Sequence, residues 1–220
     1  MLVVYNPVDD WTICSSPKTG TNTLETLSQT QENCSSKRLH ADWFQGRWNL
    51  PEYPFDKTTT YFGIVRDPVD YYVSGYRMSV DIQWAPQDQQ WVFNSPNNLT
   101  EHLETVLSFY PLKEIRPGYG DDYHMFLHHC VYHPMHNYSA ITNCLQKQIN
   151  YVTIDTVKHL FKGTHFPHLH LTKTVYPNLT NKDIDLLSKL YDHWPEKIFS
   201  FEKTVNTYKE KHYENGRFES

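Results

Sequence analysis

Glycine is scarce in this sequence, which has 8 glycines among 220 residues, roughly half of the ~7% found on average. Glycine adopts left-handed backbone torsions without a steric cost, so a sequence that uses few glycines tends to keep them where no other residue fits. Three of the eight, Gly20, Gly63 and Gly75, lie in or beside the two motifs described below. Glycine positions therefore help to locate a site.

Long apolar runs are also absent. No stretch approaches the ~18 apolar residues of a membrane span, and the first residues show no basic region followed by an apolar one. We therefore expect a cytoplasmic protein with no membrane partner. The four cysteines are widely spaced and form no Cys-x-x-Cys pair, so we expect free thiols.

An excess of positive charge is missing too. The 20 Lys and Arg residues stand against 25 Asp and Glu residues, which gives a net charge of −5 and a pI near 6.2. This balance argues against nucleic acid as a partner, because such binding depends on a strong positive field. An anionic ligand would have to be held by a local site. The oligomeric state is not indicated.

What the sequence does contain predicts one folded domain over residues 1–220. Aromatic residues make up 15% and the hydrophobic set 39%, which is enough for a substantial core. No repeat, low-complexity tract or Gly/Ser/Pro-rich linker marks a boundary. Residues 208–220 are polar and charged, and we expect them to fray.

Strand-like and helix-like segments alternate along the chain. The predicted strand–helix pairs are Trp11–Ser15 with Thr21–Leu27, Thr58–Val65 with Val69–Met78, and Asn150–Ile154 with Thr156–Phe161. Further helices are predicted around Leu99–Tyr110 and, after a Thr180-x-x-Asp183 capping signal, up to Trp194. Alternation of this kind predicts an α/β fold with a central parallel sheet flanked by helices.

A polar loop lies between the first strand and its helix. It reads Pro17, Lys18, Thr19, Gly20, Thr21, Asn22 and Thr23. Backbone N–H groups at a helix start, a glycine that permits close approach and a lysine charge together form an anion site. A capped helix start with an incidental lysine is the alternative. No Gly-x-x-x-x-Gly-Lys-Ser/Thr string is present, which argues against Mg²⁺-nucleotide hydrolysis.

A second polar cluster follows the next strand. Arg66 stands at the strand's carboxyl end, where open α/β sheets bind ligands, and a guanidinium pairs well with phosphate oxygens. Pro68 can begin the following helix, which places Ser74 and Arg77 on one face. The alternative for Arg66 is a surface ion pair with Asp67 or Asp70.

Taken together, the two segments resemble a known family. Pro17–Thr21, Arg66–Asp70 and Ser74–Tyr76 are similar to the 5′-phosphosulfate loop and the 3′-phosphate motif of sulfotransferases that use 3′-phosphoadenosine-5′-phosphosulfate (PAPS), with the closest likeness to the carbohydrate (Golgi-type) branch. Weaker similarity extends over Ile149–Ile154 and the region from His168 to Tyr191. Asn22 stands where that branch usually has a second threonine, and Tyr71 where it often has arginine.

The resemblance implies a P-loop-NTPase-like sulfotransferase fold and sulfuryl transfer from PAPS to a hydroxyl or amine of a carbohydrate or small-molecule acceptor. It implies that Lys18 stabilises charge on the leaving oxygen, and that Arg66 and Ser74 bind the 3′-phosphate. Residues Pro17, Lys18, Thr19, Gly20, Thr21, Asn22 and Thr23 would hold the 5′-phosphate. No metal would be needed. Residues 79–148, which read as helices and loops, would form the acceptor side.

The general base is less clearly indicated. His40 follows the first helix at about the place where the cytosolic members carry a base, and its side-chain type suits the task. Glu25 and Glu52 are alternatives. A histidine run between His124 and His136 lacks the His-Glu-x-x-His and cysteine spacings of zinc sites. Two other functions remain open: a P-loop-like, Mg²⁺-dependent kinase or nucleotide-binding protein, and a non-catalytic module that binds the product nucleotide or a glycan.

Overall fold

The chain divides into two compact units in a computed structural model. The structure describes residues 2–16, 18–38, 57–81, 96–108, 110, 134–135, 138, 147–161 and 175–213. A sheet unit comprises residues 1–66 and 134–171, and a helical unit comprises residues 67–133 and 172–220. The single domain predicted from the sequence stays a prediction, since compact units also occur within one domain.

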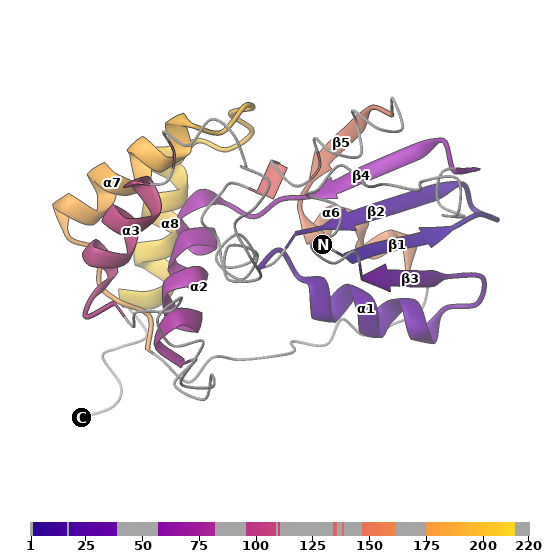
Figure 1. Cartoon of the computed structure of the whole chain (residues 1–220), viewed down its shortest axis with the longest axis horizontal. Coiled ribbons are helices and arrows are strands. Elements are labelled where there is room, and N and C mark those ends of the chain that lie inside the picture. The colour runs from indigo at the N-terminus through magenta and orange to yellow at the C-terminus, as the bar shows by residue number, and fades with distance from the viewer. Residues whose placement is uncertain are drawn as a thin grey trace, which may run out of the picture. The chain divides into compact units, whose positions relative to one another are not determined.

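The sheet unit is built on a mixed sheet. Its described strands are β1 (Leu2–Asn6), β2 (Trp11–Ser15), β3 (Ser35–Arg38), β4 (Thr60–Ile64) and β5 (Ile149–Val152), in the spatial order β3-β1-β2-β4-β5 (Figure 1). β2, β4 and β5 are parallel to one another, whereas β1 is antiparallel to both β2 and β3. The predicted α/β class is confirmed, and the all-parallel sheet is wrong for β1 and β3.

The antiparallel part has a local cause. Residues 7–10 alone join β1 to β2, and a connection that short permits only an antiparallel hairpin. The Asn6 side chain shapes this turn, because its Oδ1 accepts hydrogen bonds from the amides of Val8 and Asp9, both at 3.0 Å. β1 therefore pairs with β2 on the side of β2 that faces away from β4.

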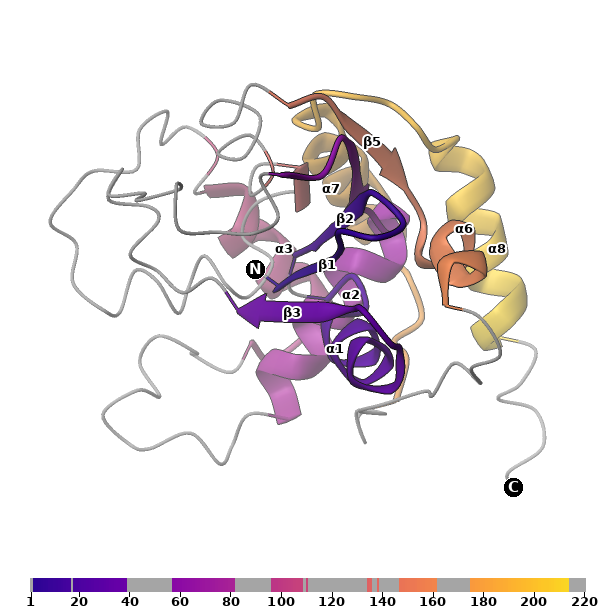
Figure 2. The same cartoon turned by 90° about the vertical axis from the view of Figure 1, so that its right-hand side faces the viewer.

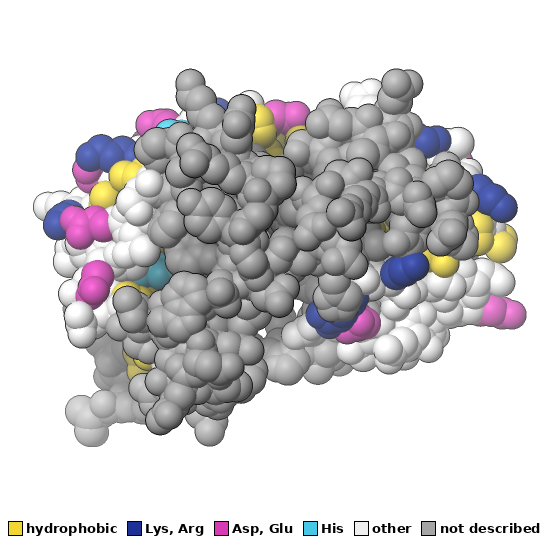
Figure 3. Space-filling view, in the orientation of Figure 1, with side chains coloured by type: hydrophobic (Ala, Val, Ile, Leu, Met, Phe, Trp, Pro, Cys, Tyr) yellow, Lys and Arg dark blue, Asp and Glu magenta, His cyan; other side chains and the backbone are white. Residues whose placement is uncertain are grey.

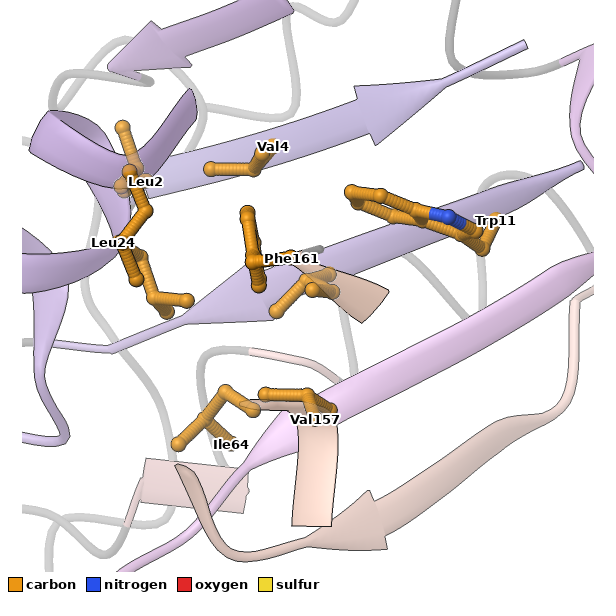
Figure 4. Packing of buried hydrophobic residues seen from close by; sticks show 9 residues of the cluster. Leu2, Val4, Trp11, Leu24, Ile64, Val157 and Phe161 are labelled. Carbon is orange, nitrogen blue, oxygen red and sulfur yellow. The ribbon is translucent and has the colours of Figure 1, made fainter. Parts of the chain in front are cut away.

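Helices on one face of the sheet form the main core. α1 (Thr21–Thr30) contributes Leu24 and Leu27, and the segment of α6 (Ile154–Val157) and η5 (Lys158–Leu160) leads to Phe161. Figure 4 shows Leu24, Val157 and Phe161 packed over apolar side chains of the strands, which are Leu2, Val4, Trp11 and Ile64. Both cartoon views place α1 alongside β3 (Figures 1 and 2). Burial of this apolar surface orients the amino end of α1 toward the end of β2.

On the opposite face of the sheet, close packing of large side chains depends on Gly63. A Cβ on Gly63 would lie 2.8 Å from Ile149, 2.9 Å from Tyr138 and 3.0 Å from Tyr151. Glycine at this position therefore lets three large side chains approach the strand. Tyr138 is completely buried as a result.

The helical unit contains α2 (Pro68–Asp81), α3 (Leu99–Ser108), α7 (Asn181–Asp192) and α8 (Phe201–Tyr213) among its described residues. The capping signal is confirmed, because Thr180 and Asp183 form a reciprocal capping box at the start of α7. Thr100 donates a further hydrogen bond to Asp183 at 2.5 Å and so connects α3 to α7.

The predicted fraying from residue 208 is wrong for residues 208–213, which belong to α8. Tyr208 is buried and its hydroxyl donates to the Pro177 carbonyl at 2.8 Å, while the Tyr213 hydroxyl donates to the Leu179 carbonyl at 3.3 Å. Two phenols thus fix a helix whose remaining surface is charged.

The described surface shows no gathering of one charge sign on the face that Figure 3 presents, where acidic and basic side chains lie beside one another. This distribution agrees with the acidic net charge in pointing to local binding of any anion. None of the helices in the described ranges has both the length and the apolar character needed to cross a membrane.

Candidate functional site

The loop that follows β2 begins with a tight turn. The Thr19 amide donates to the Ser16 carbonyl at 3.3 Å, so Lys18 occupies the third position of that turn. Lys18 has a φ of 66°, in the left-handed region that bulky residues rarely occupy. Such backbone strain is typical of functional loops, where the surrounding structure holds a side chain in a fixed place. The turn therefore presents the one lysine of the motif in a constrained position.

Three hydroxyl groups hold the inside of the loop. Ser15 Oγ lies 3.0 Å from Thr19 Oγ1 and 3.1 Å from Thr21 Oγ1. Both threonine hydroxyls donate to the Ser16 carbonyl at 2.8 Å, and Thr19 is only 3% exposed. Thr19 and Thr21, predicted as ligand contacts, thus use their hydroxyl protons to shape the loop.

Gly20 has a backbone torsion that other residues rarely adopt, and a side chain packs close to its Cα. Its φ is 103°, and a Cβ there would lie 2.4 Å from Cδ1 of Ile154. Ile154 comes directly from the region after β5, so the loop is packed against a third strand end. The positive φ confirms the expectation that this glycine stands where other residues fit poorly.

The start of α1 has no side-chain cap at its N-cap residue, because that residue is Gly20. The Leu24 amide donates a helical hydrogen bond to the Gly20 carbonyl at 3.0 Å. In any helix the backbone N–H groups of the first turn point out of the amino end. Together with the helix dipole they favour an anion at this end. Asn22 and Thr23, both half-buried, belong to the same turn.

A buried tyrosine connects this loop to the next strand. The Tyr138 hydroxyl accepts a hydrogen bond from the Ser16 amide at 2.9 Å and donates to the Ile64 carbonyl at the end of β4. Burial raises the pKa of this phenol, which stays protonated and able to donate. Tyr138 was not identified from the sequence, since nothing around it distinguishes it from the other 15 tyrosines.

Arg66 lies at the same edge of the sheet as the loop. Ser15 and Ile64 are register partners in the parallel pair of β2 and β4, so both strands end at one level. The Val65 amide then donates to the Val152 carbonyl at 2.9 Å, and Arg66 follows, half-buried. Lys18 and Arg66 therefore leave neighbouring strands at their carboxyl ends, the usual ligand-binding edge of such sheets.

The other predicted residues lie outside the loop and the strand ends described above. Ser74 is half-buried on α2, in the helical unit, and Tyr71 is buried against Trp194 of that unit. Pro17, His40 and Glu52 lie outside the described residues, as do the histidines of the 124–136 run. Their roles stay predictions.

Glu25, an alternative base, is engaged elsewhere. Its carboxylate accepts hydrogen bonds from the Arg38 guanidinium, and the hydrogen bond from Arg38 lowers the pKa of Glu25. A carboxylate with a lowered pKa is a weaker proton acceptor. The geometry therefore favours a different role for Glu25.

Comparisons with known proteins find no match. A scan against protein-family models matches no family, a search of curated proteins matches no sequence, and no solved structure matches the fold. The two motifs and the geometry of the sheet edge that carries them are therefore the features that indicate a function.

Proposed function

We propose that this protein is a PAPS-dependent sulfotransferase that transfers a sulfuryl group to a hydroxyl or amine of a carbohydrate or small molecule. The observation that carries the proposal is the shared sheet edge of Lys18 and Arg66, which follow adjacent parallel strands. A nucleotide with phosphates at both its 5′ and 3′ positions needs two separate cationic contacts. The two motifs supply them in the order that the resemblance implies.

The loop and helix start would hold the 5′ end of the donor. First-turn amides of α1 bind phosphate oxygens, and Gly20 allows the backbone to come close. Arg66 would bind the 3′-phosphate through its planar guanidinium, with Ser74 as a second donor. These contacts are local, so an acidic protein can bind a highly charged nucleotide.

The chemistry is an in-line displacement at sulfur. The acceptor oxygen or nitrogen forms a bond to sulfur while the bond from sulfur to the bridging phosphate oxygen breaks, and 3′-phosphoadenosine-5′-phosphate (PAP) leaves. Lys18 would stabilise the negative charge that develops on the bridging oxygen. A base, for which His40 is our candidate, would take the acceptor's proton. Lys18 and the start of α1 supply positive charge without a metal.

Nucleotide selectivity tests the proposal directly. We expect PAP to raise the melting temperature of the protein, and AMP, which lacks the 3′-phosphate, to raise it much less. ATP with Mg²⁺ should have little effect. Stabilisation by ATP with Mg²⁺ but not by PAP would contradict the proposal in favour of a kinase-like protein.

Turnover separates an enzyme from a binding module. Incubation with sulfur-labelled PAPS and a panel of saccharide and phenolic acceptors should yield labelled product with the wild-type protein and none with Lys18→Ala. Tight PAP binding without transfer to any acceptor would contradict catalysis and favour a nucleotide-binding module.

A further inference from the structure

Arg38, at the end of β3, contacts two residues of α1. Its Nε donates to Glu25 Oε1 at 2.8 Å, and its Nη2 donates to Asn22 Oδ1 at 2.9 Å and to Glu25 Oε2. Asn22 is the second residue of the helix, in the turn whose amides face the proposed phosphate site. Arg38 thus binds the one side chain in which the loop departs from the sulfotransferase pattern.

The contact fixes the orientation of the Asn22 amide. A guanidinium has only donors, so the atom that faces Arg38 has to be the carbonyl oxygen of the amide. The NH₂ group of Asn22 then lies on the side away from Arg38. Helical side chains also lean toward the helix's amino end, which directs Asn22 toward the loop. An oriented NH₂ group at this place can donate to a phosphate oxygen.

Orientation matters more for asparagine than for threonine. A threonine hydroxyl rotates and can donate to any nearby anion, whereas an asparagine amide presents either a donor or an acceptor. An amide oxygen turned toward a phosphate would repel it. Asn22 therefore requires a partner that a threonine would not require, and Arg38 meets this requirement.

Glu25 keeps Arg38 in place. The hydrogen bond from Arg38 lowers the pKa of Glu25, so the carboxylate is ionised at neutral pH. The ion pair also places a negative charge directly beside the arginine's positive charge. Arg38 therefore acts on the site through the amide that it orients, and only weakly through its own field.

We propose that Arg38 is a positioning residue for the 5′-phosphate group of the donor nucleotide, acting by holding Asn22 with its NH₂ group toward the loop. The inference rests on the proposed function and extends it by a residue outside both motifs. Arg38 is 43% exposed, so its substitution leaves the core of the sheet unit intact.

A double-mutant cycle tests the proposal. The PAP dissociation constant is measured by calorimetry for the wild type, Arg38→Ala, Asn22→Thr and the double variant. We expect Arg38→Ala to weaken PAP binding about tenfold in the wild-type background, the worth of one hydrogen bond to a charged group. In the Asn22→Thr background, Arg38→Ala should change the PAP dissociation constant little, because threonine needs no orienting partner.

Two controls and one further variant separate positioning from a general effect. Lys37→Ala removes a cation from the same strand and should leave PAP binding unchanged. Adenosine 3′-monophosphate, which has no 5′-phosphate, should bind equally to the wild type and Arg38→Ala. Asn22→Asp keeps the partner of Arg38 but has no donor, and it should lose PAP binding while its melting temperature stays at the wild-type value.

The outcomes are distinct. An equal loss on Arg38→Ala in both backgrounds would mean that Arg38 acts by direct contact or by its field, and would overturn the inference. So would unchanged PAP binding in Arg38→Ala or wild-type binding in Asn22→Asp. Failure of the wild-type protein to bind PAP at all would instead overturn the proposed function.

Discussion

The hydroxyl of Tyr138 accepts a hydrogen bond from the amide of Ser16 at 2.9 Å, although 122 residues separate the two in the sequence. The same hydroxyl donates to the carbonyl of Ile64, where β4 ends. Ser16 opens the loop that carries Lys18, and Ile64 precedes Arg66 by two residues. One buried phenol therefore joins the backbones of both proposed nucleotide contacts.

Tyr138→Phe should weaken both the fold and the site. The substitution leaves the Ser16 amide buried without its acceptor, which costs about 1 to 3 kcal/mol of unfolding free energy. Because the loop also loses its connection to β4, we expect the PAP dissociation constant to rise at temperatures where the variant is still folded. Urea unfolding and calorimetry measure the two effects. A loss of stability with unchanged PAP affinity would show that Tyr138 supports only the core.

Lys18 combines a functional charge with a strained backbone, so its substitutions should separate activity from stability. In Lys18→Gly the left-handed torsion no longer carries the cost of roughly 1 kcal/mol that it has for other residues. The greater flexibility of glycine in the unfolded chain offsets part of this stabilisation. We expect Lys18→Gly to match or exceed the wild type in melting temperature, and Lys18→Ala to keep the strain. Both should lose most sulfuryl transfer. Near wild-type turnover in either variant would contradict the role of Lys18 at the leaving oxygen.

The fold could be predicted where local patterns are strong. The apolar runs of β2, β4 and β5 and the polar segments after them indicated the strands and the helices that follow. β3 consists of Ser-Ser-Lys-Arg and was not predicted, because an exposed edge strand needs no apolar alternation. β1 was not predicted as a strand either, and its antiparallel direction follows from the short turn after it rather than from a pattern within the strand.

The candidate site could likewise be predicted only where its residues are close together in the sequence. Lys18, Gly20 and Arg66 were identified because a strand, a loop and a helix start are adjacent in the sequence. Tyr138 and Ile154 were missed, since each reaches the loop from a distant segment and neither stands in a motif of its own. Sequence patterns therefore predicted the candidate binding groups, and the structure added which groups hold the loop in place.

Gly20→Ala should be costly for two separable reasons. The new Cβ meets Ile154 Cδ1 at 2.4 Å, and alanine disfavours the φ of 103°. We expect the unfolding free energy to fall by roughly 1 to 2 kcal/mol, mostly from the torsion, because Cδ1 is the end of a flexible side chain and can shift. Ile154→Val removes the Cδ1 atom, so Gly20→Ala should cost less in that background, with the torsional part remaining. An equal cost in both backgrounds would show that the contact with Ile154 is unimportant.

Arg66→Ala should change nucleotide selectivity more than turnover of bound donor. Loss of a charge-assisted contact to the 3′-phosphate is expected to weaken PAP binding about 10- to 100-fold. AMP binding should stay the same, because AMP lacks that phosphate. Arg66→Lys keeps the charge but loses the planar fork, and it should give an intermediate affinity. An equal loss for AMP and PAP would place Arg66 elsewhere in the site.

His102 gives the helical unit a group that resists protonation. The residue lies on α3, is 8% exposed, and has its ring 5.9 Å from that of Tyr76. Within the described part of the chain its Nε2 has no hydrogen-bond partner. Burial lowers the pKa of His102 to about 4, so the imidazole is neutral in the folded protein at ordinary pH.

Stability should therefore fall as the solution is acidified. Between pH 6.5 and about 4 the unfolded chain binds a proton at His102 and the folded chain does not, so acid favours unfolding. The loss can reach on the order of 3 kcal/mol at the lower end and is absent above the unfolded pKa. His102→Leu should remove this part of the pH dependence, which urea unfolding at neutral pH and at about pH 5 would measure. Equal acid sensitivity in the two proteins would assign the effect to other groups.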